Sequence, residues 1–214
     1  MGTYQILVLG NYKDSAMYHP LDGVEEKLKE IFAGTAELFC TDDTSKLLEL
    51  KAGHFDGVIS YLDIWDSVLS QEESEALEGF VKGGGGLLAL HNGISIQGRE
   101  NLKELVGAKF LTHPAQEEIC FAPTAVSHPV VAGVESFSMV EEPYQFEFAD
   151  VPYTLLLNYT YQGQIYPAGW CREVLDGRVV FLTPGHTAEK FKDPQYRRLI
   201  LNSLRWCMRG ISDN

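Results

Sequence analysis

The stretch Gly83-Gly-Gly-Gly-Leu-Leu-Ala-Leu-His-Asn-Gly93 decides how this chain folds. Its apolar run, Leu87–Leu90, has the composition of a buried central strand. The run ends at His91 and is followed by Asn-Gly, a dipeptide that marks a sharp turn. In open α/β sheets, ligands bind just beyond the carboxyl ends of strands. We therefore expect His91 to lie where such a fold performs its chemistry, at the position that a nucleophile elbow gives to Ser or Cys.

Strand and helix signals alternate on the amino-terminal side of this stretch. Capping-box patterns at Asp22/Glu25 and Ser70/Glu73 predict the starts of two helices. A shorter helix is predicted over Thr44–Leu50. The expected strands are Gln5–Leu9, Ala36–Cys40, Val58–Leu62 and Leu87–Leu90. This alternation predicts a parallel sheet with right-handed crossover connections, and so an α/β fold.

After residue 110 the pattern changes to a succession of strands. An Asp176-Gly177 turn signal joins the last two of them as a hairpin. Asp193, followed by Pro194, is typical of the start of a final helix. The expected strands are Gln116–Ala122, Met139–Phe148, Tyr153–Thr160, Ile165–Cys171 and Val179–Thr183. Because no repeat or linker interrupts the chain, we expect one domain over residues 1–214.

Composition excludes several functional classes. The chain has 214 residues, 45% of them hydrophobic and 22% charged, as in ordinary globular domains. A formal net charge of −13 disfavours binding to nucleic-acid phosphates and to anionic membrane surfaces. We find neither a signal peptide nor a membrane span. The four cysteines form no Cys-x-x-Cys pair, so we expect reduced core thiols in a cytoplasmic protein.

The histidines carry the strongest functional signal. His19, His91 and His186 follow the first, fourth and last expected strands, and these strands could all end at one edge of the sheet. Glu141, Glu142 and Tyr144 add carboxylates and a phenol. Converging imidazoles and carboxylates suit general acid–base catalysis or a divalent metal such as zinc.

Simpler interpretations remain open at this point. The sequence has no His-x-x-x-His or His-Glu-x-x-His pair, so a metal site would have to be assembled from distant segments. His113 and His128 each precede a proline and could cap loops through their ring nitrogens. Trp65 follows the third expected strand beside carboxylates, an arrangement that is useful for holding sugars. The imidazoles could equally hydrogen-bond a polar ligand without any metal.

The motifs as a set resemble the ThuA-like (trehalose utilisation) family, a branch of the class I glutamine amidotransferase-like superfamily. Their order and spacing carry the resemblance along almost the whole chain. The matching segments are Phe55-Asp-Gly-Val58, Phe80–His91, Gly107-Ala-Lys-Phe110 with His113, His128-Pro129 to Gly133-Val134, Glu141-Glu-Pro-Tyr144, and Gly185-His186 followed by Asp193-Pro194 and Trp206.

The resemblance implies a flavodoxin-like, three-layer α/β/α sandwich with a mostly parallel central sheet and additional strands in the carboxyl-terminal half. In the wider superfamily the elbow carries a nucleophilic cysteine, paired with a histidine after a late strand. Here His91 occupies the elbow, and His186 is similar to the late histidine. The acidic partner two residues further on is replaced by Ala188. The family name implies a role in the catabolism of trehalose and related sugars.

Two functional hypotheses follow. The first is a site that acts on or binds a carbohydrate-like small molecule, with self-association into a homo-oligomer left open. The second is a non-catalytic binding or assembly module that kept the scaffold and lost the catalytic triad. Under the first, the catalytic residues are His91, His186 and Glu142, the substrate contacts are His19, Trp65, His113 and Tyr144, and the metal ligands are His91, His113 and His186.

The sequence predicts that this protein does not hydrolyse glutamine. Glutamine hydrolysis at such an elbow requires a thiolate nucleophile, and His91 stands in its place. The purified protein should therefore release no ammonia from glutamine. Ammonia release that iodoacetamide abolishes would contradict this prediction.

Overall fold

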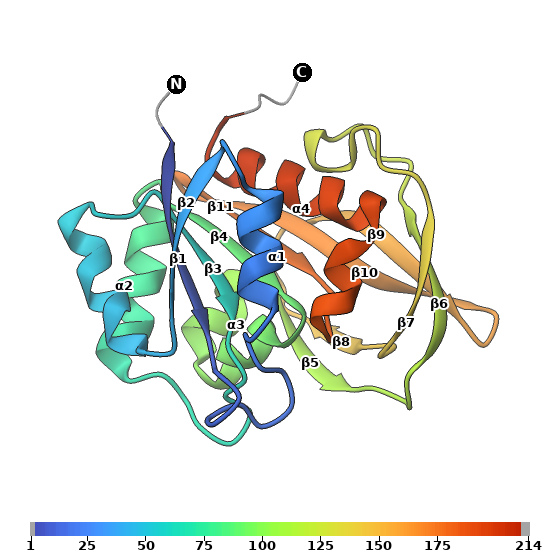
Figure 1. Ribbon diagram of the computed structural model, residues 1–214, viewed down its shortest axis with the longest axis horizontal. Coiled ribbons are helices and arrows are strands. Elements are labelled where there is room, and N and C mark those ends of the chain that lie inside the picture. The colour runs from blue at the N-terminus through green and yellow to red at the C-terminus, as the bar shows by residue number, and fades with distance from the viewer. Residues whose placement is uncertain (1–2, 211–214) are drawn as a thin grey trace.

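A computed structural model describes residues 3–210, so residues 1–2 and 211–214 of the expected domain lie outside the described residues. Within this range a nine-stranded sheet has the order β2-β1-β3-β4-β11-β10-β9-β6-β7 (Figure 1). Its first five strands are mutually parallel. They are β2 (Ala36–Thr41), β1 (Tyr4–Gly10), β3 (Gly57–Tyr61), β4 (Gly86–Leu90) and β11 (Gly177–Leu182).

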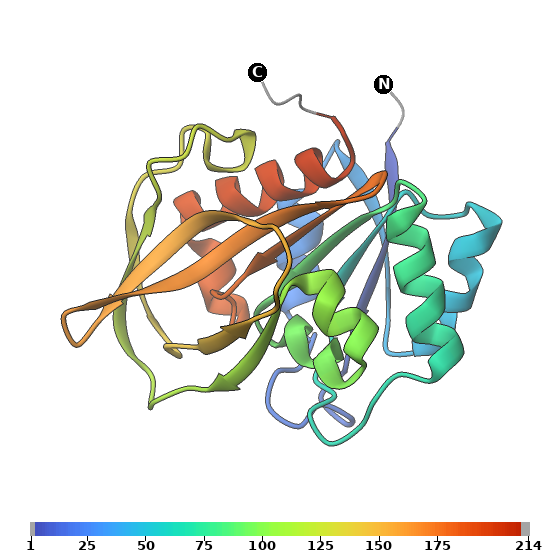
Figure 2. The same ribbon diagram turned by 180° about the vertical axis from the view of Figure 1, so that it is seen from behind.

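Helices cover both faces of the parallel half of the sheet. Helices α1 (Val24–Ile31) and α4 (Pro194–Cys207) lie on one face, in front of the sheet in Figure 1. Helices α2 (Gln71–Lys82) and α3 (Glu100–Val106) lie on the other, as Figure 2 shows. Alternate residues of β1 belong to two separate core clusters, one on each face. Every residue of β3, β4 and β11 is buried, as expected for central strands covered on both sides.

The carboxyl-terminal half extends the same sheet with four antiparallel strands. These are β10 (Gln164–Val174), β9 (Thr154–Tyr161), β6 (Glu117–Pro123) and β7 (Phe137–Glu141). Strands β5 (Ala108–Thr112) and β8 (Gln145–Phe148) form a separate antiparallel pair. The α/β class is as expected, but the sheet is larger and more mixed than a flavodoxin-like core.

The single strand expected over Met139–Phe148 is wrong. Strand β7 ends at Glu141, and β8 begins at Gln145 in the other sheet. Pro143 lies in the gap and has no N–H to donate to a strand ladder. The break therefore releases Glu142 and Tyr144 from the sheet and lets them face the functional site described below.

The helix starts agree with the sequence in two of three cases. Ser70 and Glu73 form the expected capping box, and Asp193 caps α4. The capping box expected at Asp22 is wrong: Gly23, with φ 75°, is the N-cap of α1.

The short 3-10 helices are η1 (Thr44–Ala52), η2 (His91–Gly98), η3 (Pro129–Val131) and η4 (Ala188–Lys192).

The cysteines are all free thiols, but they do not all belong to the core. Cys171 and Cys207 are buried, whereas Cys120 is exposed, which corrects the expectation of four core thiols. No helix in the described part of the chain is long and apolar enough to cross a membrane.

The turn after β4 is the most constrained part of the backbone near the sheet edge. His91 has φ 46°, in the left-handed region that side chains other than Gly rarely adopt. The Ser60 hydroxyl donates to the Gly93 carbonyl at 3.0 Å, which holds β3 against the turn. A Cβ on Gly93 would lie 1.9 Å from the Ser60 carbonyl oxygen, so only glycine fits there.

We predict that Gly93→Ala lowers the free energy of unfolding by at least about 2 kcal/mol, because the backbone of β3 would have to move. Gly79→Ala is the matched control, since this exposed residue of α2 has no atom within 4 Å of an added Cβ. In a helix interior that change should stabilise by about 0.5–1 kcal/mol. Urea denaturation measures both, and equal midpoints for the two variants would refute the steric argument.

Candidate functional site

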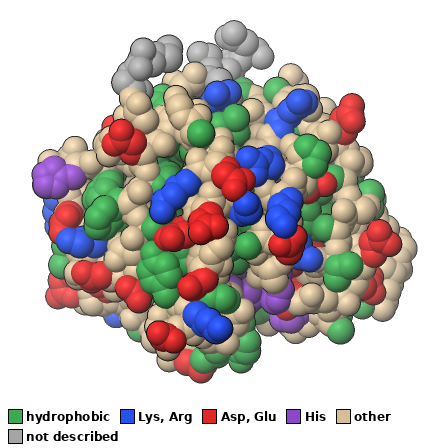
Figure 3. Space-filling view, in the orientation of Figure 1, with side chains coloured by type: hydrophobic (Ala, Val, Ile, Leu, Met, Phe, Trp, Pro, Cys, Tyr) green, Lys and Arg blue, Asp and Glu red, His purple; other side chains and the backbone are tan. Residues whose placement is uncertain are grey.

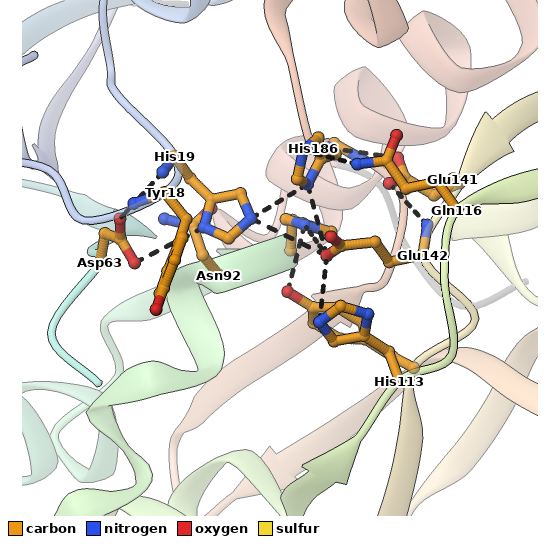
Figure 4. A network of polar contacts seen from close by, with 12 residues as sticks. Tyr18, His19, Asp63, Asn92, His113, Gln116, Glu141, Glu142 and His186 are labelled. Carbon is orange, nitrogen blue, oxygen red and sulfur yellow. Dashed lines mark hydrogen bonds and ion pairs between the residues drawn. The ribbon is translucent and has the colours of Figure 1, made fainter. Parts of the chain in front are cut away.

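Three histidines from distant segments, His19, His91 and His186, meet at the carboxyl edge of the parallel strands. Figure 4 labels His19 and His186. His19 follows β1, His91 follows β4 and His186 follows β11. Parallel strands end at the same edge of a sheet, so the loops after them lie close together. Glu142 reaches the same place from the connection between β7 and β8.

Glu142 lies among the three imidazoles. Its Oε2 atom is 3.3 Å from Nδ1 of His186, 3.4 Å from Nε2 of His91 and 3.9 Å from Nε2 of His19. Nε2 of His19 and Nδ1 of His186 are 3.0 Å apart. One nitrogen from each histidine and a Glu142 oxygen lie within 4.8 Å of one another. Four donors this close together have the composition of a transition-metal site.

His91 is completely buried and has one ring nitrogen directed at the cluster. Its Nδ1 is 2.7 Å from the Thr183 carbonyl oxygen, which can only accept, so Nδ1 carries the proton. Nε2 then carries a lone pair rather than a proton, and this lone pair accepts from the Tyr144 hydroxyl at 3.1 Å. Burial lowers the pKa of His91, although the nearby carboxylates oppose this. The ring is therefore a neutral imidazole suited to bind a metal or accept a proton.

His19 is oriented by the buried carboxylate of Asp63. Oδ1 of Asp63 is 3.5 Å from Nδ1 of His19, and Oδ2 accepts from the His19 backbone N–H at 2.8 Å and from that of Tyr18. Burial alone would lower the pKa of His19, but Asp63 and Glu142 raise it. A carboxylate behind an imidazole is the usual second layer of a metal site, and it turns Nε2 toward the cluster.

Glu141 fixes the positions of its neighbours without entering the cluster. This fully buried carboxylate accepts from the backbone N–H groups of Gly185 at 2.8 Å and His186 at 3.1 Å. Its other oxygen accepts from the Glu142 N–H at 3.1 Å. The side-chain amide of Gln116 lies 2.8 Å from Nε2 of His186. His186 is thus held at both its backbone and its ring.

The charge on Glu142 is stabilised by the histidines. Burial would raise the pKa of this carboxyl, but contacts with His186, His19 and His91 outweigh burial and hold the pKa far below its usual range. Within the described residues, Oε2 is buried and has no hydrogen-bond partner of acceptable geometry. A buried, ionised oxygen without such a partner indicates a place for a cation or a ligand proton.

A pocket of about 480 Å³ opens beside this cluster. Trp65, Phe110 and Tyr144 form an aromatic wall, with ring centroids 5.0 Å apart for the first two and 4.5 Å for the last two. On the molecular face shown in Figure 3, histidine side chains gather near the bottom and appear separately at the left edge, and basic and acidic side chains are intermixed elsewhere. The residues that line the pocket are Tyr18, His19, Trp65, Phe110, His113, Glu142, Tyr144 and His186.

His113 lies at the margin of the cluster. Its Nε2 is 3.8 Å from Glu142 Oε2, its Nδ1 is 2.8 Å from the Pro114 carbonyl oxygen, and its ring stacks on Tyr144. It is not among the four residues whose donor atoms converge. The converging donors are thus those of His19, His91, Glu142 and His186, a set that shares His91 and His186 with the metal ligands expected from the sequence.

Sequence reasoning missed the residues that support the site. Asp63 lies two residues after the end of β3 and directly after the expected strand Val58–Leu62, and this position at a strand end is a usable signal. Gln116 carries no motif, and only the fold brings it to His186. The structure places His54 on the surface and lets His128 accept from the Val130 N–H, which agrees with the simpler interpretation of His128.

A family model described as trehalose utilisation (ThuA) matches residues 14–207. No curated protein matches the chain. A putative ThuA-like protein from Bacteroides uniformis is 20% identical over 95% of this chain and 91% of its own, with a TM-score of 0.75. A second putative ThuA-like protein, from Parabacteroides merdae, is 16% identical over 98% of this chain and 91% of its own, with a TM-score of 0.76. A cold-adapted β-galactosidase from Rahnella sp. R3 is 12% identical over 98% of this chain and 32% of its own, with a TM-score of 0.67. At these identities the likenesses show the fold alone.

The Asp63–His19 pair predicts a defined pH window for stability. The pKa of His19 in the folded protein is raised above 6.5. Its contribution to the free energy of unfolding is therefore complete below pH 6.5 and is lost as the pH rises through the pKa of the folded state. Burial would raise the pKa of Asp63, but hydrogen bonds from His19 and two backbone groups lower it below 3.8. The contribution of Asp63 to the free energy of unfolding is therefore present above pH 3.8 and is lost as the pH falls. Both contributions to stability are present between pH 3.8 and pH 6.5.

Asp63→Asn should therefore reduce the free energy of unfolding most near pH 5, by about 2 kcal/mol, and less near pH 8. Urea titrations in the presence of a chelator measure this difference. Asp66→Asn is the control, since Asp66 is exposed in the same loop and should show no such pH dependence. A loss for Asp63→Asn that grows from pH 5 to pH 8 would contradict the assignment.

Proposed function

Because this chain belongs to the trehalose utilisation (ThuA) family, we propose that its histidine pocket binds one divalent transition-metal ion and acts on a carbohydrate-like small molecule. The observation that carries the proposal is the convergence of four donor atoms within 4.8 Å, one of them a buried carboxylate oxygen without a hydrogen-bond partner among residues 3–210. Three imidazoles and a carboxylate are donors that zinc and its neighbours in the first transition row accept.

The residues around the cluster fit this role. His19, His91 and His186 would supply Nε2, Nε2 and Nδ1, and Glu142 an oxygen. His19 and His91 each direct the second ring nitrogen to an oxygen acceptor, as metal-bound histidines do. A bound ion would supply Lewis acidity toward a hydroxyl or carbonyl oxygen of the ligand.

The chain's own side chains would position the ligand and move its protons. Tyr144 and His113 line the pocket beside Glu142. An ion bound to Nε2 of His91 would release the Tyr144 hydroxyl from that nitrogen, and the hydroxyl could then donate to an oxygen held at the cluster. Burial and the nearby carboxylates raise the pKa of Tyr144 well above 10, so the phenol acts as a donor. His91, His186 and Glu142 stay our candidates for the reaction itself, and His19, Trp65, His113 and Tyr144 for contact with the substrate.

The relationship to class I glutamine amidotransferase-like proteins, and with it a flavodoxin-like three-layer core, is part of the same proposal. Its support is the turn after β4, where His91 has φ 46° at the end of a fully buried strand. A strained residue at this place is the geometry of a nucleophile elbow. With an imidazole there, the scaffold would serve binding or acid–base chemistry in place of covalent catalysis.

One observation favours the non-catalytic alternative. Nε2 of His19 and Nδ1 of His186 lie 3.0 Å apart, at hydrogen-bond distance, so the two rings can satisfy one another without an ion. In a pure binding or assembly module the cluster would be a closed polar network. The two candidates differ in one measurable property, which is the affinity for metal.

We predict that the protein without a polyhistidine tag binds one zinc ion per chain. His91→Ala combined with His186→Ala should weaken binding by at least about a hundredfold, because half of the four donors are removed. His54→Ala removes an exposed histidine outside the cluster and should leave affinity unchanged. Occupancy should also fall as pH drops below neutrality, because bound histidines must be deprotonated. Competition titration with a chromogenic chelator measures the affinity, and negligible zinc in the unmodified protein would favour the non-catalytic alternative.

A further inference from the structure

The pocket beside the histidine cluster has two chemically different ends. Its polar end consists of His19, His113, His186 and Glu142 (Figure 4). Its other lining residues, Tyr18, Trp65, Phe110 and Tyr144, are all aromatic. Tyr18 is 64% exposed and stands at the rim. Of the described residues that line the pocket, none is Lys, Arg, Asn, Gln, Ser or Thr.

The charge of this environment disfavours an anionic ligand. Recognition of phosphate or carboxylate relies on Arg, Lys or a set of backbone N–H groups. The pocket offers no basic side chain other than imidazole, and the buried carboxylates of Glu141, Glu142 and Asp63 surround the imidazoles. The net charge of −13 adds a repulsive background. A phosphorylated sugar would therefore lack the partners that its charge requires.

The aromatic wall also limits what can lie against it. The rings of Trp65 and Phe110 are tilted by 52°, and those of Phe110 and Tyr144 by 53°, so together they form a concave apolar surface. A sugar ring against this surface would carry hydroxyl groups all around its edge, and the only polar atoms of these aromatic side chains are the indole N–H of Trp65 and the tyrosine hydroxyls, of which that of Tyr144 already contacts His91. An apolar ring needs no such partners, and an aromatic one can stack on or meet edge-on the rings of the wall.

We propose that this pocket selects an uncharged ligand in which the sugar held at the histidine cluster carries an apolar, aromatic-sized substituent. An aryl glycoside meets this description. A sugar phosphate does not, and an all-hydroxyl disaccharide meets it less well. The proposal rests on the proposed function for the polar end of the pocket only. Trp65, Phe110 and Tyr18 are its specificity-determining residues.

The test compares ligands that share one sugar. Phenyl α- and β-D-glucopyranosides, the two methyl glucopyranosides, trehalose and glucose 6-phosphate are each titrated against zinc-loaded and chelator-treated protein by ligand-observed NMR. The better phenyl glucoside should bind at least about tenfold more tightly than its methyl counterpart and than trehalose, which corresponds to about 1.4 kcal/mol. Glucose 6-phosphate should bind more weakly than any phenyl glucoside.

Variants then locate the preference. Trp65→Ala and, separately, Tyr18→Ser should each reduce the ratio of phenyl to methyl affinity by at least about threefold while leaving zinc affinity unchanged. Tyr18 is largely exposed, so its variant should fold even if loss of Trp65 disturbs the packing. Phe39→Ser removes an exposed aromatic ring on edge strand β2 and should leave the ratio as it was.

The outcomes separate this proposal from the proposed function. Equal phenyl and methyl affinities, tighter binding of glucose 6-phosphate, or no binding of any of these compounds would overturn the aromatic selectivity, whatever the protein does with zinc. A phenyl preference that persists in chelator-treated protein, with no measurable zinc affinity, would support the aromatic selectivity and remove the metal from the proposed function.

Discussion

The ionised carboxylate of Glu142, buried among three imidazoles, is the constraint on which the rest of the site depends. Taking a charge out of water costs several kcal/mol unless partners compensate it. Here His186 and His19, with nitrogens 3.3 and 3.9 Å from Oε2, provide part of the compensation. Nε2 of His91 presents a lone pair and adds none, so the remainder is left for a cation or a ligand proton. Each histidine is then held by a further group, so the cost is distributed over a layer of buried hydrogen bonds.

That supporting layer explains several features with no obvious local reason. Asp63 and Glu141 are buried carboxylates, and each orients a member of the cluster. Asp63 accepts from two backbone N–H groups and Glu141 from three. The left-handed conformation of His91 turns its ring so that Nδ1 reaches the Thr183 carbonyl on the neighbouring strand-end loop. Strain in the backbone at this one residue is consistent with a site whose geometry matters more than local stability.

The sequence predicted the parallel half of the fold well because its signals are local. Buried strands such as Leu87–Leu90, the Ser70 capping box and the Asp193 cap depend on residues close together in the chain. The break between β7 and β8 was missed because flanking residues at 139–141 and 145–148 are good strand formers, and Pro143 alone does not reveal that the two parts enter different sheets. The convergence of His19, His91 and His186 could be predicted, because each follows a strand that ends at the same edge. The presence of His19 rather than His113 in the converging set, and the position of Gln116, depend on side-chain directions that only the folded chain determines.

X-ray absorption at the zinc K-edge of the zinc-loaded protein tests the central claim most directly, because it reports which atoms surround the ion. The account predicts a first shell dominated by imidazole nitrogens at about 2.0–2.1 Å, with a carboxylate or solvent oxygen and the outer-shell scattering of about three histidine rings. A shell of oxygen atoms alone, or one containing sulfur, would contradict the assignment of His19, His91, His186 and Glu142 as a metal site.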